Sequence, residues 1–224
     1  MGDWFIATEG VKIVKDNPGL WPQIITGVLS AGAALGGVWL THYFARRREE
    51  RAAAAKLGSE RLFIATELVF LLEKFAEGCA AVATDQGYLN QERITIPEIR
   101  APSLDYSAVS GDWRVLPAKL MYRIRELPVM QDEADRTINA AEQLSPDFDE
   151  FFEARQYQYT RLGLKAIIQA RRLRRLVGLP HTRLDATRRS AQNVLWQEWR
   201  QERKRRRVLA VLMAQAPFQF KDTP

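Results

Sequence analysis

The hydrophobic and polar positions divide the chain into one uncharged run followed by several amphipathic stretches. Residues 17–45 contain no Asp, Glu, Lys or Arg, and three consecutive arginines follow them. A helix rises about 1.5 Å per residue and the hydrocarbon core of a bilayer is about 30 Å thick, so about 20 apolar residues cross it. The segment Ile24–Ala45 supplies 22 residues. We therefore predict one membrane-spanning helix over residues 21–45.

The flanks of this run resemble those of a membrane span. Trp and Tyr are enriched at both bilayer interfaces, and basic residues collect on the cytoplasmic side. The residues expected at the interface are Trp21, Trp39, Tyr43, Arg46, Arg47 and Arg48. The basic cluster after the run predicts a bacterial inner-membrane protein with its N-terminus outside and its C-terminal domain in the cytoplasm.

Two other interpretations of the run are open. A buried helix of a soluble protein would have a shorter apolar run. A cleaved signal peptide would begin with a short basic segment and end at a cleavage site, whereas here the run is long and arginines follow it.

Small residues gather on one part of the span. Gly32 and Gly36 form a G-x-x-x-G pattern, which lets two helices approach closely in lipid. The residues expected to pack are Ser30, Gly32, Ala33, Gly36 and Gly37. We expect a homo-oligomer paired through this face; the alternative is a loosely packed anchor.

After the span, apolar residues recur every three or four positions, which predicts amphipathic helices. Helix is expected almost unbroken from Pro22 to about Thr84, with Gly58 as its weakest point. The segment 85–116 contains several Pro and Gly residues and one short strand candidate, 93–96. A loop of this length inside a compact domain is often functional, so we expect it to face a partner.

Three further helices follow the loop. One begins at Pro117, and Pro128 is expected to kink or break it. The next begins at Ser145-Pro146-Asp147 and ends at Val177, before Gly178. A basic C-terminal helix is expected over 185–215, beginning near Thr182 or Asp185.

Together these patterns predict an all-α protein. An extracytoplasmic amphipathic segment, 1–20, precedes the span. A cytoplasmic helical domain, 46–224, follows it as a bundle of about four helices with the one long loop.

Charge is distributed unevenly along the cytoplasmic domain. Residues 126–153 contain nine acidic residues and one basic residue, whereas residues 171–207 contain thirteen basic residues and three acidic ones. The basic part could pair with the acidic part or could face a polyanion.

The basic cluster near the C-terminus has two tryptophans beside it. The residues expected to contact a polyanion or a partner are Trp196, Trp199, Arg200, Arg203, Lys204, Arg205, Arg206 and Arg207. Anionic lipid headgroups, nucleic-acid phosphates and a protein partner would all fit this composition. The alternative is a solvated helix face that pairs with residues 126–153, with its tryptophans in the bundle core.

The sequence carries no catalytic or metal-binding signature. Phosphate-binding loops, G-x-S-x-G, H-E-x-x-H and C-x-x-C patterns are missing, so we expect no catalytic residue, metal, cofactor or small-molecule substrate. The acidic group Asp147, Asp149, Glu150 and Glu153 lies at a helix start, where acids stabilise the helix dipole without a ligand. The one cysteine, Cys79, is expected in the core.

These observations predict a single-pass membrane-anchored interaction or regulatory protein that holds a partner at the cytoplasmic membrane face. Two alternatives remain open. One is a membrane-disrupting effector of a bacterial toxin or phage-defence system, whose Gly- and Ala-rich span would form a pore or leak. The other is a membrane-tethered component that binds nucleic acid through its last helix.

Overall fold

The computed structural model describes residues 21–91, 93–144 and 149–215, and within these the side chains of 39–91, 93–143 and 150–212. The expected N-terminal segment 1–20 and the helix start at Ser145-Pro146-Asp147 lie outside the described residues. The same holds for the side chains of 21–38, which include Trp21 and the small residues of the expected span.

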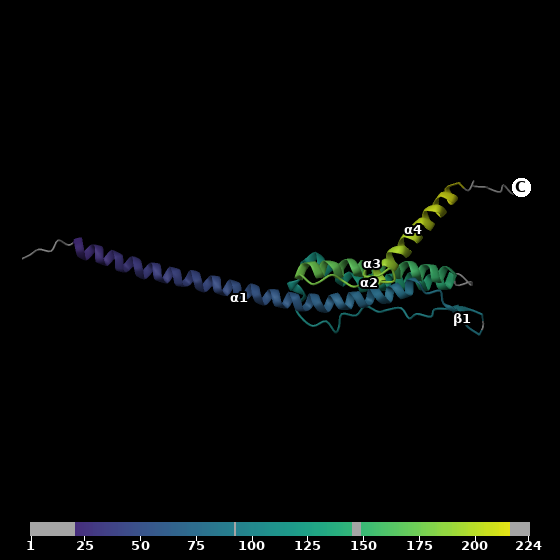
Figure 1. Cartoon of the computed structure of the whole chain (residues 1–224), viewed down its shortest axis with the longest axis horizontal. Helices are drawn as coiled ribbons and strands as arrows, with labels where there is room; N and C mark the ends of the chain where they lie inside the picture. Colours follow the sequence, from purple (N-terminus) through teal and green to yellow (C-terminus); the bar gives the residue numbers. More distant parts are fainter. Residues whose placement is uncertain (1–20, 92, 145–148, 216–224) are drawn as a thin grey trace, which may run out of the picture. The chain divides into compact units, whose positions relative to one another are not determined.

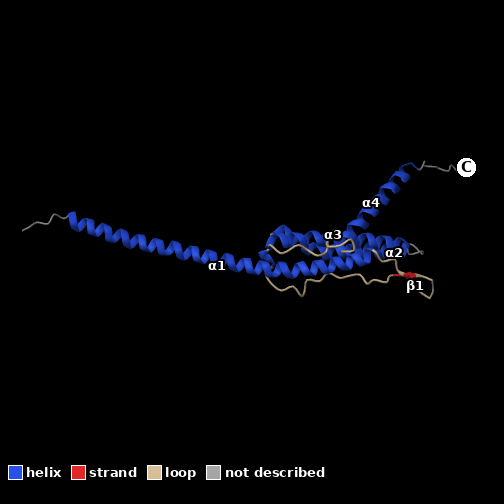
Figure 2. Cartoon of the chain, in the orientation of Figure 1, coloured by secondary structure: helices blue, strands red, loops and turns tan. Residues whose placement is uncertain are grey.

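The described residues form four α-helices, two short strands and one 3-10 helix. The helices are α1 (Trp21–Ala83), α2 (Ala118–Leu144), α3 (Asp149–Val177) and α4 (Ala191–Gln215). The strands β1 (Tyr88–Leu89) and β2 (Thr95–Ile96) pair antiparallel, and the 3-10 helix η1 spans Trp113–Val115. Figure 2 shows how little strand accompanies the helices. The all-α prediction is confirmed.

The chain separates into two compact units, Met1–Ala55 and Lys56–Pro224. Helix α1 is continuous across the boundary, and Gly58 does not interrupt it. A search of the described residues finds no helix whose length and apolar content would take it through a bilayer.

The second unit is built around one hydrophobic core. Helices α2 and α3 lie side by side, with the C-terminal part of α1 beside them (Figure 1). The amphipathic face of α1 supplies fully buried residues at helical spacing, as its pattern predicts. These are Ile64, Leu68, Leu72, Cys79 and Val82.

Gly163 permits the closest approach between helices in this core. A Cβ atom at Gly163 would lie 2.7 Å from Leu195 of α4 and 2.8 Å from Cys79 of α1. Both distances are shorter than real Cβ contacts, so α3 can meet both neighbours here only without a side chain. The aromatic residues Phe151, Phe152 and Tyr159 on the same helix are buried.

A buried ion pair joins the end of α1 to α3. Arg155 Nη1 donates to Asp85 Oδ2 at 2.7 Å, and the two side chains are 5% and 1% exposed. The Asp85 carboxylate also accepts backbone N–H bonds from Gly87 at 2.9 Å and Ile99 at 3.0 Å. Arg155 donates in addition to the Ile99 carbonyl. One carboxylate and one guanidinium therefore hold α1, α3 and both ends of the hairpin segment together.

Further along, the long loop is held by side chains from the helices that it crosses. The Gln131 amide on α2 donates to the Pro102 carbonyl at 2.7 Å and accepts from the Leu104 N–H at 3.0 Å. Arg61 on α1 donates to the Val115 carbonyl at 2.9 Å. The loop is thus ordered against the bundle, although few of its residues are in regular secondary structure.

Pro128 lies inside α2, and of the two outcomes expected there, a kink or a break, the break is wrong. A proline removes the N–H that would bond to the carbonyl four residues earlier, which here is Ile124. The Tyr106 hydroxyl from the loop donates to that carbonyl at 2.7 Å. The loop therefore supplies the hydrogen bond that proline removes, and α2 runs unbroken from Ala118 to Leu144.

The predicted end of α3 is confirmed, whereas the predicted start of α4 is not. Helix α3 ends before Gly178, whose φ of +69° permits the Leu179 N–H to bond to the Arg174 carbonyl, as a glycine C-cap requires. Helix α4 begins at Ala191, and the predicted start near Thr182 or Asp185 is wrong. Hydroxyl side chains hold this segment in turns instead: Thr182 Oγ1 accepts from Leu184 N–H, and Ser190 Oγ accepts from Thr187 N–H.

We expect Asp85→Asn to lower the free energy of unfolding by about 3 kcal/mol, because Arg155 would remain buried without an opposite charge. Denaturant titration of the full chain in detergent micelles, followed by tryptophan fluorescence, measures this. Asp132→Asn makes the same substitution at an exposed position of α2 and should leave stability unchanged. Equal losses of stability from both substitutions would contradict a stabilising role for the Asp85–Arg155 pair.

The same carboxylate predicts a pH dependence. Burial raises the pKa of Asp85, but the N–H groups of Ile99 and Gly87 and the Arg155 guanidinium outweigh it and hold the pKa below its ordinary value. Its contribution is complete above the unfolded pKa of about 3.9 and is lost as pH falls through the lower folded value. The wild-type chain should lose more stability across this acid range than Asp85→Asn.

We expect Tyr106→Phe to cost about 1–3 kcal/mol, because it leaves the Ile124 carbonyl without a donor. In a Pro128→Ala background the helix supplies its own N–H, so the same substitution should cost less. A double-mutant cycle of unfolding free energies measures the coupling. Additive effects of the two substitutions would show that the hydroxyl does not replace the missing helix bond.

Candidate functional site

The basic residues of α4 divide into paired and unpaired groups. Glu202 bonds to Arg206 at 2.7 Å and to Arg205 at 2.9 Å, and Arg205 also pairs with Glu153 of α3. Burial raises the pKa of Glu202, but the two guanidinium groups outweigh it and lower the pKa overall. These two arginines are therefore largely neutralised within the protein, through Glu153 of the acidic segment and Glu202 of α4 itself.

Two arginines of α4 lie against aromatic rings, and one of them, Arg206, also belongs to the paired group. Arg203 lies 5.1 Å from the centre of the Trp199 ring, and Arg206 lies 3.7 Å from the centre of the Tyr157 ring. Trp199, Arg203 and Arg207 also line a hollow of about 400 Å³. Cation–π contacts of this kind fix the guanidinium planes on the α4 surface.

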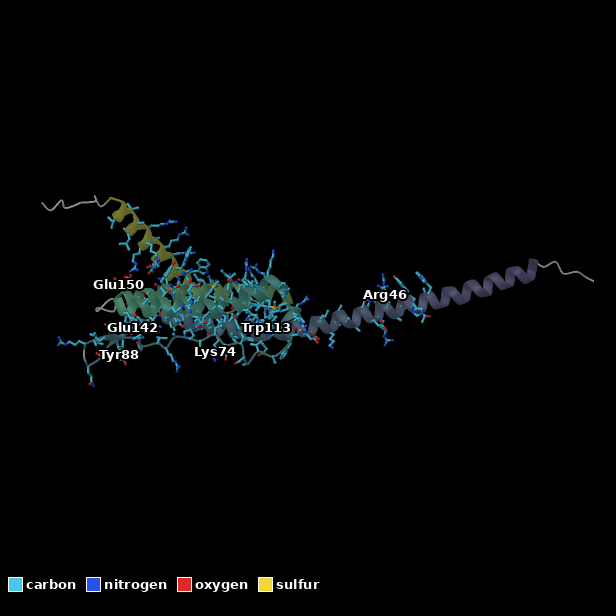
Figure 3. The ribbon with its side chains drawn as sticks, turned by 180° about the vertical axis from the view of Figure 1, so that it is seen from behind. Arg46, Lys74, Tyr88, Trp113, Glu142 and Glu150 are labelled. Carbon is cyan, nitrogen blue, oxygen red and sulfur yellow. The ribbon has the colours of Figure 1, made fainter. Side chains whose placement is uncertain are left out.

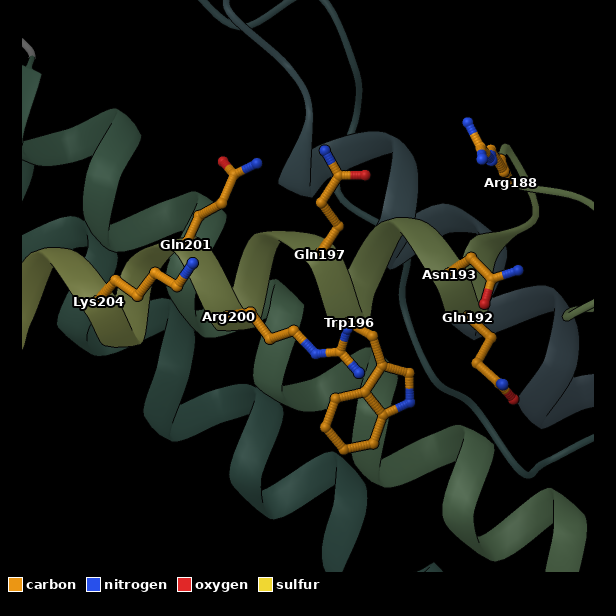
Figure 4. Close-up of a pocket in the computed structure, with 8 residues that line it drawn as sticks. All are labelled: Arg188, Gln192, Asn193, Trp196, Gln197, Arg200, Gln201 and Lys204. Atoms are coloured by element: carbon orange, nitrogen blue, oxygen red, sulfur yellow. The ribbon is translucent and has the colours of Figure 1, made fainter.

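The opposite stripe of α4 forms a groove with unpaired cations. The groove has a volume of about 800 Å³ and is lined by Arg188, Trp196, Arg200 and Lys204, among others (Figure 4). Trp196, Arg200 and Lys204 follow one another at intervals of four, so they share a helix face. The three cations form no ion pair with any described residue, in contrast to Arg205 and Arg206.

The groove also presents side-chain amides. Gln192, Asn193, Gln197 and Gln201 line it. Asn193 is committed to the turn before α4, because its Nδ2 donates to the Thr187 carbonyl at 2.7 Å. Gln192 is buried, and its Oε1 has no hydrogen-bond donor among the described residues.

Trp196 and Trp199 are partly buried and pack against the hydrophobic core. Their ring centres are 5.4 Å apart and their planes are nearly perpendicular, at 89°. This contact fixes both rings, so each has one part in the core and another part available at the surface of α4.

The sequence alone identified only part of this groove. Trp196, Arg200 and Lys204 were among the expected contact residues, whereas Arg188 and the glutamines were not singled out. The repeat of Asn193, Gln197 and Gln201 at intervals of four was a visible signal. The sequence pattern could not predict that Arg188 lines the groove, because its position depends on the turns that precede α4.

The expected membrane-interface residues lie in the first unit. Trp39 and Tyr43 stack with ring centres 5.6 Å apart, and the Arg47 guanidinium lies 4.9 Å from the centre of the Tyr43 ring. Trp39 is 66% exposed and Phe44 is 60% exposed. A series of large exposed aromatic residues next to arginines is unusual for a surface that faces only water.

The hairpin of the long loop exposes a second, smaller apolar patch. Tyr88 and Leu89 in β1 are 51% and 68% exposed, and Figure 3 shows Tyr88 near the end of the hairpin. The Asp85–Arg155 pair holds the base of this hairpin, so the patch is presented from a fixed support.

The described residues contain no cluster of three or more His, Cys, Asp or Glu side chains that could hold a metal ion. Of the acidic group at the start of α3, Asp147 lies outside the described residues, and Glu153 pairs with Arg205. Cys79 is fully buried, as expected, and burial raises the pKa of its thiol well above the ordinary value. A thiol in this state is a poor nucleophile.

Comparison with known proteins adds no relative from which a function could be transferred: no protein-family model, curated protein or solved structure matches this chain.

Proposed function

We propose that this chain is a single-pass, membrane-anchored helical protein that holds a partner at the cytoplasmic face of a bacterial inner membrane. The observation that carries the proposal is the uncharged run 17–45, which ends at three arginines and continues directly into a helix of a folded unit. A run of this length matches the thickness of the hydrocarbon core.

The side chains at the end of the run support the anchor. Trp39, Tyr43 and Phe44 are exposed on α1. Exposure of this much apolar surface to water has an unfavourable free energy. Aromatic rings at the headgroup level and arginines beyond them are the usual boundary of a span on its cytoplasmic side.

Two surfaces of the second unit support a role in holding a partner. The hairpin offers the exposed pair Tyr88 and Leu89, and α4 offers the groove with three unpaired cations. Exposed apolar side chains and unpaired cations are typical of binding surfaces, so binding is the function that these surfaces fit best.

The anchor predicts that the full chain sediments with membranes after cell lysis. We expect it to resist extraction at alkaline pH and to dissolve in detergent. Leu35→Arg puts a charge near the middle of the run, at a cost of about 2.5–3.5 kcal/mol for insertion, and should shift protein to the supernatant.

Leu57→Arg is the matched control, because Leu57 is exposed on α1 beyond the run. It should leave the chain in the membrane fraction. Wild-type protein that remains in the supernatant without detergent would overturn the proposal.

The small residues of the run predict self-association. We expect Gly32→Leu and Gly36→Leu to reduce energy transfer between fluorescently labelled copies in vesicles, because larger side chains keep the helices apart. Ala34→Leu is the control, since it lies two residues from each glycine, toward the other side of the helix.

The same variants separate the anchor from a membrane-disrupting effector. Overexpression that depolarises cells, and that both glycine substitutions relieve, would favour the effector. Equal energy transfer in all three variants would contradict pairing through the Gly32–Gly36 face.

A further inference from the structure

The cations of the α4 groove have no carboxylate partner among the described residues. Arg188, Arg200 and Lys204 line one hollow without a carboxylate, although α4 carries Glu198 and Glu202 on its other faces. Figure 4 shows Arg188 apart from Arg200 and Lys204, which lie one helical turn from each other. Like charges at that spacing repel one another, so this face favours a ligand with several negative charges.

Figure 4 shows how the cations relate to the tryptophan. Arg200 extends toward the Trp196 ring, and Lys204 extends along the helix in the same general direction. An anion between these two groups would lie beside an aromatic ring that the core and Trp199 hold in place. The site thus pairs positive charge with a fixed planar surface.

Gln192 lies at the edge of this lining. It is 7% exposed, and its Oε1 is a buried acceptor with no donor among the described residues. Figure 4 shows its side chain directed away from Arg200 and Lys204, so it plays no part in the choice of ligand.

We propose that the α4 groove binds single-stranded nucleic acid. Phosphates would contact Arg188, Arg200 and Lys204, and a base would stack on Trp196. Stacking on fixed aromatic rings together with a basic groove is the usual way in which proteins hold single strands.

A lipid headgroup would also satisfy the cations, and the exposed residues Val208 and Leu212 continue the same helix face beyond Lys204 at intervals of four. The groove lining itself carries side-chain amides, which suit bases better than acyl chains. Lipid binding is therefore an outcome of the test and not part of the proposal.

This inference deepens the proposed function, because an anchored chain would hold the strand at the membrane. The two can nevertheless fail separately. Oligonucleotide binding is measured on the full chain in neutral detergent micelles, whereas the anchor is tested by membrane extraction.

The experiment measures fluorescence anisotropy of labelled 12-nucleotide oligo-uridine RNA and oligo-thymidine DNA with the full chain. We expect binding that weakens steeply with salt, with a logarithmic slope of about −2 for three phosphate contacts. Arg200→Gln and Lys204→Gln should each reduce this slope by about 0.7. Trp196→Leu should weaken binding about 5- to 150-fold through lost stacking.

Arg123→Gln is the control for charge, because Arg123 is exposed on α2 and does not line the groove. It should leave both affinity and salt slope unchanged. Helical content of every variant is checked by circular dichroism, and Arg200→Gln, at an exposed position, keeps the test valid if Trp196→Leu misfolds.

Several outcomes decide the proposal. Binding to RNA alone, to DNA alone or to both supports it and identifies the strand. No binding to either, or equal loss in Arg123→Gln and Arg200→Gln, overturns it. Binding only to vesicles that contain phosphatidylglycerol, reduced by Arg200→Gln, would assign the groove to lipid and also overturn it.

Discussion

The buried pair of Asp85 and Arg155 is the interaction on which the arrangement of the second unit most depends. It lies where α1 ends, and its hydrogen bonds reach Gly87 and Ile99, on either side of the hairpin. Without it, the base of the hairpin between α1 and α2 would lose the contacts that tie it to α3. Burial of an isolated charge is costly, so each member of the pair is stable in the core only while the other is present.

Three further side-chain contacts hold the rest of the loop. Gln131 holds residues 102–104, Tyr106 reaches the Ile124 carbonyl, and Arg61 holds the Val115 carbonyl. The loop thereby becomes part of the bundle and completes α2 at the site of Pro128. A segment that looks irregular in sequence is instead held at several points by polar side chains of the helices.

Much of the fold was predictable because helical periodicity dominates the sequence. The extent of α1, the position of the long loop and the end of α3 at Gly178 each depend on local residue patterns. The errors arose where distant residues decide the local structure. Pro128 is tolerated because a tyrosine 22 positions earlier supplies a hydrogen bond, and no local pattern reveals that contact.

The candidate site was less predictable for the same reason. The composition of α4 identified a basic helix, but it could not separate the arginines that Glu153 and Glu202 neutralise from those that remain unpaired. That division depends on which face of α4 meets α3. The start of α4 was also misjudged, because Thr182 and Ser190 stabilise turns where helix propensity alone favours an earlier start.

The single cysteine has a practical consequence. Cys79 is the chain's one thiol, it is fully buried, and its pKa is raised, so it reacts slowly with maleimides while the protein is folded. A spin label or fluorophore attached to a newly introduced surface cysteine would therefore report on that position alone. The natural sequence already provides the silent background that site-directed spectroscopy usually has to engineer.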